Sequence, residues 1–284
     1  MPTQPVREQL TATSGGPAAG EPAKGEAVTL RTRLVPILTF HAIDDESSPI
    51  SFSPDALAQA LERLVESGFQ AISLLQAVQA VAGRAAVPER SCVITFDDGY
   101  RSVYDVAFPL LQRYGLTATV FLTAGEGMVR SAQMRFPQLN SRAMLSWAEV
   151  HELHRHGVEF GAHTLTHPDL RTIPLDRARV EVEGSKQVIE DALGASVASF
   201  AYPFGRSTPP VRALAEAHFA CACTDDLGIA GPQSDLYRIE RVDAYYLKPT
   251  SWFGRLDAPL FQWYLRARNV PRMARRALRE GASG

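Results

Sequence analysis

The chain has 284 residues, of which 45% are apolar, and a formal net charge of −2. This length and apolar content allow one large α/β domain or two small ones with a sizeable core. The small net charge gives no electrostatic basis for binding nucleic acid. Three cysteines, at positions 92, 221 and 223, are too few to form a disulfide framework in a chain of this length.

Residues 1–30 are predicted to form a disordered tail, because residues 1–26 are rich in Gly, Ala, Pro and Thr. This segment lacks the basic start and the apolar stretch of a signal peptide. No segment of the sequence is long and apolar enough to span a membrane. We therefore expect a cytoplasmic protein. A misassigned start codon would hide a signal peptide, and this alternative stays open.

From Leu34 onward, short β-type runs alternate with amphipathic helices. Caps and glycine stops mark the helices, as at Ser53 and Gly68 or at Ser146 and Gly157. Helices are predicted over residues 54–67, 103–114, 147–156, 176–193 and 211–217. Strands are predicted over residues 35–40, 69–73, 92–96, 117–122, 158–161, 198–202, 219–223 and 238–246, the last as one strand or a pair. About eight strands in this order favour a parallel barrel, formed by a domain over residues 31–258.

Acidic and histidine residues follow the ends of several of these strands. His41, Asp97, Asp98 and His163 all lie just beyond a predicted strand. In a parallel barrel the carboxyl ends of the strands meet at one face, which holds the active site. We therefore expect these residues to converge although they are far apart in the sequence.

The residue types point to a catalytic metal site. His163 and His167 are four positions apart, so a turn of helix or a tight loop can aim both rings at one point. With Asp98 they supply two imidazoles and one carboxylate, which leaves a position open for water. Asp97 then remains free to act as the general base. The ligand set suits zinc, which we prefer, and also cobalt, nickel or iron(II).

Each motif alone has a simpler explanation. Asp-Asp-Gly is usually a turn, and a histidine pair is often a solvated helix face. Both motifs stand at predicted strand ends, where Gly99 and Pro168 fix the turns, and this combination favours the metal site.

The segments Thr-Phe-Asp-Asp-Gly-Tyr at 95–100 and His-Thr-Leu-Thr-His-Pro at 163–168 resemble the first two motifs of the polysaccharide deacetylase family. This family is also called the NodB-homology family or carbohydrate esterase family 4. The resemblance runs from Val35 to Tyr246 and includes Val-Pro-Ile-Leu-Thr-Phe-His at 35–41 and Phe-Ala-Tyr-Pro-Phe-Gly at 200–205. It implies a distorted (β/α) barrel of seven or eight parallel strands, one divalent metal ion and hydrolysis of N-acetyl groups on amino sugars.

The resemblance also implies roles for single residues. Asp97 would be the base, and Asp98, His163 and His167 would be the metal ligands. A backbone N–H of the Pro-Phe-Gly segment at 203–205 would stabilise the oxyanion. The residues expected to bind substrate are Tyr100, Tyr202, Pro203 and Phe204, together with Arg238.

The sequence departs from the family pattern at two places. The third motif usually carries an arginine that orients the base, but Ala201 stands there, so Arg238 or Arg241 is needed as a substitute. The family's late Leu-x-x-His, the source of the general acid, is absent. We predict that His41 replaces it and protonates the leaving amine. The alternative is a structural histidine bound to Asp44 or Asp45.

Residues 259–284 are predicted to form a basic helix or tail. Six arginines fall among apolar residues there, at positions 266, 268, 272, 275, 276 and 279. Such a helix can lie on an anionic membrane surface. The alternative is a helix that packs on the barrel and exposes a basic face.

We therefore predict a metal-dependent hydrolase that removes N-acetyl groups from a glycan or glycan precursor of exopolysaccharide or cell-envelope metabolism. One alternative is an enzyme of the same fold that hydrolyses a small cyclic or linear amide. A second alternative is a glycan-binding module without activity, prompted by Ala201 and the missing late histidine.

Overall fold

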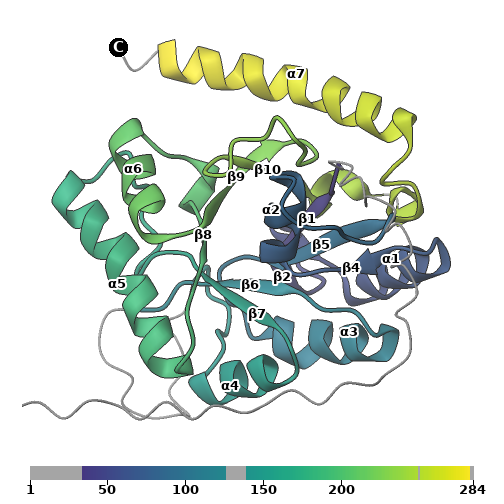
Figure 1. The fold of residues 1–284 in the computed structure, drawn as a ribbon, viewed down its shortest axis with the longest axis horizontal. Helices are drawn as coiled ribbons and strands as arrows, with labels where there is room; N and C mark the ends of the chain where they lie inside the picture. The colour runs from purple at the N-terminus through teal and green to yellow at the C-terminus, as the bar shows by residue number, and fades with distance from the viewer. Residues whose placement is uncertain (1–33, 126–138, 249, 282–284) are drawn as a thin grey trace, which may run out of the picture.

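The computed structural model describes residues 34–125, 139–248 and 250–281 (Figure 1). The predicted tail over residues 1–30 lies outside the described residues. Within the described part, the chain forms a barrel of parallel strands with helices around it, as the sequence predicts.

Seven parallel strands close the barrel, because β1 pairs with both β10 and β5. An eighth strand, β4 (Gln70–Ala71), adds to the start of β5 outside the closed ring. A separate pair, β2 (Ala42–Ile43) and β3 (Ser51–Phe52), follows β1. In ring order the seven strands are β1 (Ile37–Phe40), β10 (Ile239–Asp243), β9 (Cys221–Leu227), β8 (Ser199–Ala201), β7 (Glu159–Ala162), β6 (Thr119–Leu122) and β5 (Ser91–Phe96).

The helices begin and end close to the predicted caps and stops. Ser146 and Glu149 form a reciprocal capping box at the start of α4, and Gly194 ends α5 in the left-handed conformation. The helices are α1 (Pro54–Glu66), α2 (Leu74–Val81), α3 (Phe108–Tyr114), α4 (Trp147–Arg155), α5 (Leu175–Leu193), α6 (Pro209–His218) and α7 (Pro259–Gly281). Single turns occur at η1 (Val103–Ala107), η2 (Pro203–Gly205), η3 (Ala244–Leu247) and η4 (Thr250–Gly254).

The prediction missed helix α2. It follows β4 after two residues and has only eight residues, five of them buried. A short apolar segment of this kind does not show helical periodicity clearly enough to be separated from the preceding strand. The capping box between Ser73 and Gln76 is the sequence signal that marks its start.

Alternate residues of each strand face the inside of the barrel. Ile37 and Val93 belong to one buried cluster inside the ring, whereas their neighbours Leu38 and Ile94 belong to the larger cluster beneath the helices. The same period of two carries Thr39 and Thr95 inward. Continuing this alternation by two positions brings His41 and Asp97 to the mouth of the barrel.

Gly161 allows a close approach inside β7. A Cβ atom at this position would lie 2.5 Å from the ring of Phe121 and 2.6 Å from Ser199 Oγ. These distances are too short for any side chain, so glycine is required where β7 packs against β6 and β8. His163 comes two positions later on the same inward face.

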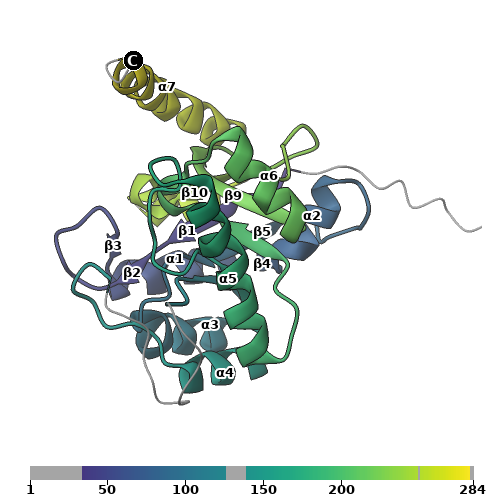
Figure 2. The ribbon, with the colours of Figure 1, turned by 90° about the vertical axis from the view of Figure 1, so that its left-hand side faces the viewer.

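Helix α7 lies across the end of the sheet formed by β9 and β10, outside the other helices (Figure 1), and projects from the body in the second view (Figure 2). Phe261 and Leu265 on one of its faces are buried at 0% and 3% exposure. Within the described residues, no helix combines the length and apolar character needed to cross a membrane.

Candidate active site

A cavity of about 230 Å³ opens at the carboxyl ends of the barrel strands. Four aspartates from three strands or strand ends line it: Asp97 and Asp98 follow β5, Asp225 lies in β9 and Asp243 ends β10. Its wall also includes Thr39, His41, Pro49, Ile50, Asn140, His163, His167, Tyr202, Phe204, Gly205 and Arg241. The convergence expected for His41, Asp97, Asp98 and His163 is therefore present in the structure.

Asp98, His163 and His167 form a compact group of ligand atoms. Asp98 Oδ1 lies 3.3 Å from Nε2 of His163 and 3.3 Å from Nε2 of His167. The donor atoms of the three side chains all lie within 4.8 Å of one another. This spacing is suitable for coordination of a single ion by two imidazoles and one carboxylate.

Two observations show that the three residues fit a divalent cation. Asp98 Oδ1 is buried and makes no hydrogen bond within the described residues. A buried carboxylate oxygen of this kind is costly unless a cation satisfies it. In addition, Nδ1 of His163 lies 2.7 Å from the carbonyl oxygen of Ala201. Nδ1–H therefore donates to that carbonyl, and in the neutral ring the lone pair of Nε2 is left available to a cation beside Asp98, as in metal-binding histidines.

A buried carboxylate holds the loop that carries the two histidines. Glu181 of α5 has no exposed surface and accepts hydrogen bonds from the backbone N–H groups of Leu165 and Thr166, at 2.8 and 2.9 Å. It also accepts from Thr166 Oγ1 at 2.6 Å and from Arg177 at 2.6 Å. These hydrogen bonds to α5 fix the conformation of the loop, and the loop in turn holds the imidazole rings of His163 and His167 in place.

Four non-glycine residues of the cavity wall adopt the left-handed backbone conformation that favours glycine. The φ angles are 72° at Asp98, 53° at Asn140, 59° at His167 and 58° at Phe204. For residues with a Cβ atom this conformation costs free energy, and it persists only where the surrounding structure imposes it. Backbone strain of this kind therefore occurs within the cavity wall, including at two of the three candidate ligands, Asp98 and His167.

Arg241 of β10 binds Asp97 through two parallel hydrogen bonds of 2.7 Å. Both side chains are only 4% exposed, and Arg241 also donates to the carbonyl oxygen of Thr224 at 3.0 Å. Burial by itself would raise the pKa of Asp97, but the charge and hydrogen bonds of Arg241 hold that pKa below its ordinary value. Asp97 is therefore an anion with a fixed orientation.

This pairing corrects the choice of Arg238 from the sequence. Arg238 is 55% exposed and pairs with Asp226 at 3.1 Å, and it does not line the cavity. Of the two arginines considered from the sequence, Arg241 is the one that binds Asp97. In the structure Ile239 and Arg241 share the inward face of β10, and Ile239 is a core residue, but the predicted span alone does not show which face points inward. A charged residue on an inward strand face requires a buried partner.

His41 lies beside Asp97 in the same cavity. The distance from His41 Nε2 to Asp97 Oδ2 is 3.9 Å, and the imidazole is 24% exposed. The alternative partner Asp44 is instead bound to Arg142 at 2.8 Å. His41 therefore lines the cavity beside Asp97, and Asp44 pairs with Arg142.

The predicted substrate-binding residues divide into two groups. Tyr202 and Phe204 line the cavity, and buried Pro203 starts the turn that carries Phe204. Tyr100 is only 1% exposed and is absent from the cavity wall, and its hydroxyl accepts a hydrogen bond from Asn140 at 2.9 Å. Burial, with a contribution from the Asp98 carboxylate, raises the pKa of Tyr100. Tyr100 is therefore a buried neighbour of Asp98 and not a residue of the cavity wall.

Residues 84–220 match the model of the polysaccharide deacetylase family. Among curated proteins, the poly-beta-1,6-N-acetyl-D-glucosamine N-deacetylase of Escherichia coli K12 is 32% identical over 45% of this chain and 20% of its own length. The enzyme of the same name from Staphylococcus epidermidis is 27% identical over 59% of this chain and 60% of its own length. The solved structure of the Streptococcus pyogenes deacetylase PplD in complex with acetate covers 75% of this chain and 92% of that protein, with 26% identity and a TM-score of 0.67.

Residues 84–220 of the chain are therefore similar to the polysaccharide deacetylase family, and the relatives named above are, by their names, deacetylases. The matched segment contains Asp97, Asp98, His163 and His167. His41 and Arg241 lie outside it on either side, so their places at the site rest on the fold of this chain.

Proposed function

We propose that the chain is a metal-dependent deacetylase that hydrolyses N-acetyl groups on amino sugars of a glycan. The observation that carries this proposal is the arrangement of Asp97, oriented by Arg241, beside the Asp98, His163 and His167 group in one cavity. It combines an ionised base with a ligand set that leaves coordination positions open, and both are needed for amide hydrolysis.

A divalent ion held by Asp98, His163 and His167 would supply Lewis acidity and lower the pKa of a bound water molecule. Asp97 accepts a proton from the attacking water, since it is ionised and its oxygens are held by Arg241. His41 then protonates the leaving nitrogen, because an amide anion is too poor a leaving group.

The Pro203–Gly205 turn supplies the donor to the developing oxyanion. Proline carries no N–H group, and the N–H of Gly205 donates to the carbonyl oxygen of Tyr202 at 2.8 Å. Of these three residues, Phe204 is therefore the one to which we assign the oxyanion donor. Its ring is 53% exposed and packs against the ring of His167, with 4.8 Å between centroids, so it also offers an apolar face to a sugar.

For the substrate we propose N-acetylglucosamine units of a polymer or of a glycan precursor. Two of the relatives named above act, by their names, on poly-β-1,6-N-acetyl-D-glucosamine. The family match and the complete set of base and ligands favour this substrate class over a small amide and over a glycan-binding role without activity.

The test is metal analysis combined with acetate release from N-acetylglucosamine oligomers. Asp98→Ala, His163→Ala and His167→Ala should each lose bound metal and activity, because two remaining ligands hold an ion poorly. Asp97→Asn should keep the metal and lose roughly two to four orders of magnitude in rate, since an amide does not accept the proton of water.

Glu62→Ala on α1, which removes an exposed carboxylate that does not line the active-site cavity, is the matched control and should change neither metal content nor rate. Full metal content in all three ligand variants would overturn the metal assignment. Loss of metal from Asp97→Asn would show that the roles of the two adjacent aspartates are reversed.

A further inference from the structure

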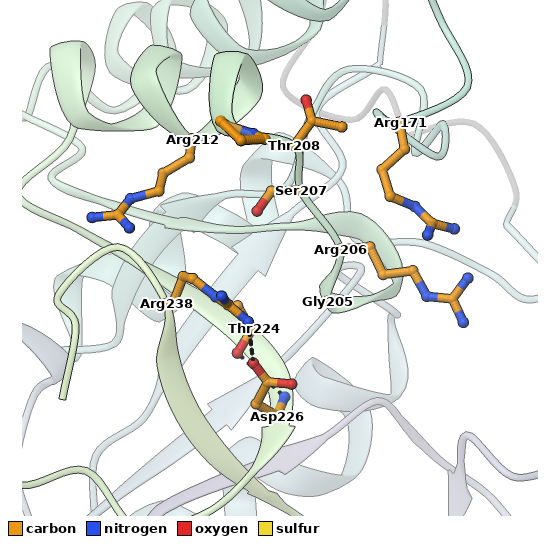
Figure 3. Close-up of a pocket in the computed structure, with 10 residues that line it drawn as sticks. Arg171, Gly205, Arg206, Ser207, Thr208, Arg212, Thr224, Asp226 and Arg238 are labelled. Carbon is orange, nitrogen blue, oxygen red and sulfur yellow. Dashed lines mark hydrogen bonds and ion pairs between the residues drawn. The ribbon is translucent and has the colours of Figure 1, made fainter. Parts of the chain in front are cut away.

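Next to the active-site cavity lies a second pocket with the opposite charge. It has a volume of about 290 Å³ and is lined by four arginines, at positions 171, 206, 212 and 238, and by one carboxylate, Asp226 (Figure 3). The four aspartates of the active-site cavity therefore adjoin a pocket rich in guanidinium groups.

The two pockets share a wall. Gly205 lines both, between Phe204 on the active-site side and Arg206 on the arginine side. Along β9 the side chains alternate, so Asp225 faces the active-site cavity while Thr224 and Asp226 face the arginine pocket. A ligand that extends past the Pro203–Gly205 turn would pass from one pocket to the other.

The arginines come from four different parts of the fold. Arg171 follows the His163–His167 loop, Arg206 follows the turn at the shared wall, Arg212 lies in the first turn of α6, and Arg238 precedes β10. Figure 3 shows Arg171 and Arg206 on one flank of the Ser207–Thr208 segment and Arg212 and Arg238 on the other. Guanidinium groups brought together from distant segments repel one another unless anions compensate their charge.

The protein's own carboxylates form ion pairs with three of the four arginines. Arg171 is paired with Asp169, Arg212 with Glu216 and Asp235, and Arg238 with Asp226. Arg206 forms no ion pair within the part of the chain that the structure describes, and its side chain is partly exposed. The position beside the shared wall thus offers a guanidinium group that is available to a ligand.

We propose that this arginine pocket, residues 171, 206, 212 and 238, is a subsite for an anionic group that the glycan substrate carries close to the N-acetylated sugar. The planar guanidinium group binds carboxylates and phosphates through paired hydrogen bonds, so a uronic acid and a phosphoryl group share the required chemistry. This inference rests on the proposed function and specifies its substrate as an acidic glycan or a phosphorylated glycan precursor.

The kinetic test uses three oligosaccharides of equal length that contain one N-acetylglucosamine unit. One is neutral, one carries a neighbouring glucuronic acid and one carries a neighbouring phosphate. The native enzyme should have a kcat/KM about ten- to a hundredfold higher for an acidic oligomer than for the neutral one, the usual range for a hydrogen bond to a charged group. The comparison of the two acidic oligomers shows which anion the pocket prefers.

Arg206→Gln and Arg171→Gln should remove this preference by raising KM for the acidic oligomers while kcat stays the same. Arg179→Gln is the matched control, because Arg179 is a surface arginine of α5 that pairs with Glu183 outside the pocket. Equal kcat/KM for all three oligomers in the native enzyme would overturn the subsite. Equal losses on neutral and acidic oligomers in the Arg206 and Arg171 variants would also overturn it.

Calorimetry on the native protein separates this inference from the proposed function. The deacetylated forms of the same oligomers cannot turn over, and the acidic ones should bind more tightly than the neutral one, with a preference that weakens as salt is added. If no oligomer releases acetate but the acidic ones still bind more tightly, the proposed function fails and the subsite stands. If acetate is released and binding shows no acidic preference, the subsite fails and the function stands.

Discussion

Arg241 and Asp97 depend on each other at the bottom of the active-site cavity. Removing one partner of a buried, doubly hydrogen-bonded pair leaves the other as a buried charge without compensation. We expect Arg241→Met to lower the free energy of unfolding by roughly 3–5 kcal/mol, as measured by urea denaturation. Arg241→Lys should recover only part of this loss, since an ammonium group does not reproduce the two parallel hydrogen bonds.

Arg238→Met is the matched control for this prediction. The Arg238 side chain is 55% exposed, so this substitution should change the free energy of unfolding by no more than about 0.5 kcal/mol. If the Arg238 and Arg241 variants were equally stable, the buried pair would not make the contribution assigned to it.

His41 has the position of a general acid for the leaving nitrogen. We expect His41→Ala to keep its metal and its fold but to lose roughly two to four orders of magnitude in amide hydrolysis. An ester substrate should be less affected, because an alkoxide leaves more readily than an amide anion. The measurement compares acetate release from N-acetylated and O-acetylated sugars, with metal content determined in parallel.

His218→Ala serves as the control for His41, since His218 lies at the end of α6 and pairs with Glu183. It should retain full activity on both substrates. Near-native amide hydrolysis by His41→Ala would show that the proton comes from another group in the cavity.

At the scale of elements, α5 positions the histidine loop through Glu181. We expect Glu181→Gln to weaken Zn²⁺ affinity by about ten- to a hundredfold, because an amide NH₂ group does not accept the backbone N–H of Leu165 or Thr166. Glu183→Gln, two positions along the same helix and partly exposed, should bind Zn²⁺ like the native protein. A competition titration with a chelating dye measures both. Unchanged affinity in Glu181→Gln would show that the loop keeps its shape without this carboxylate.

The barrel and the ligand group could be predicted because local signals agree with the fold. Caps and glycine stops define most helices, and the acidic and histidine residues follow apolar runs such as β5 and β7. Strand ends of a parallel barrel converge, so Asp98, His163 and His167 could be assigned to one site without coordinates.

The choice between Arg238 and Arg241 could not be made from the predicted span of residues 238–246. A shift of one residue in a strand moves every side chain to the other face, so the choice depends on the register of β10. The structure sets that register by pairing Ile239 with Cys223 and Arg241 with Leu227. The burial of Tyr100 could not be predicted from the sequence either. It depends on the turn at Gly99 and on packing against a distant segment that includes Asn140.

At the scale of the whole molecule, α7 has two different apolar faces. Phe261 and Leu265 pack on the body, where Arg272 also binds Asp225 and the hydroxyl of Tyr246. Leu260, Trp263 and Val270 form a second stripe that is 59–67% exposed. The side chains from residue 273 onward, including Arg275, Arg276 and Arg279, lie outside the described residues.

We propose that the exposed stripe, with exposed Arg266 and Arg268 beside it, rests on an anionic membrane surface. The full chain should bind vesicles that contain phosphatidylglycerol and should bind less at high salt. Trp263→Ser combined with Val270→Ser should lower this binding at least about tenfold, since each exposed apolar side chain adds roughly 1.5–3 kcal/mol when buried. Sedimentation with vesicles measures the bound fraction.

Removal of all residues after Ala258 would be a poorer test, because it also removes Phe261 and Leu265 from the packed face. Vesicles of phosphatidylcholine alone are the control and should bind weakly. Equal binding of the native and doubly substituted chains, or no binding of either, would contradict the membrane proposal.

The closure of the barrel between its first and last strands has a consequence for the order of synthesis. Arg241 is made 144 residues after Asp97, and it comes from β10, the last strand to enter the ring. Until β10 leaves the ribosome, an enclosed Asp97 would be an anion without its partner, at a cost of several kcal/mol. For the growing chain, an incomplete barrel that leaves Asp97 exposed to water therefore has a lower free energy than one that encloses it. We therefore expect closure of the ring and completion of the site to occur together once β10 is made, and a chain that stops before β10 to lack both.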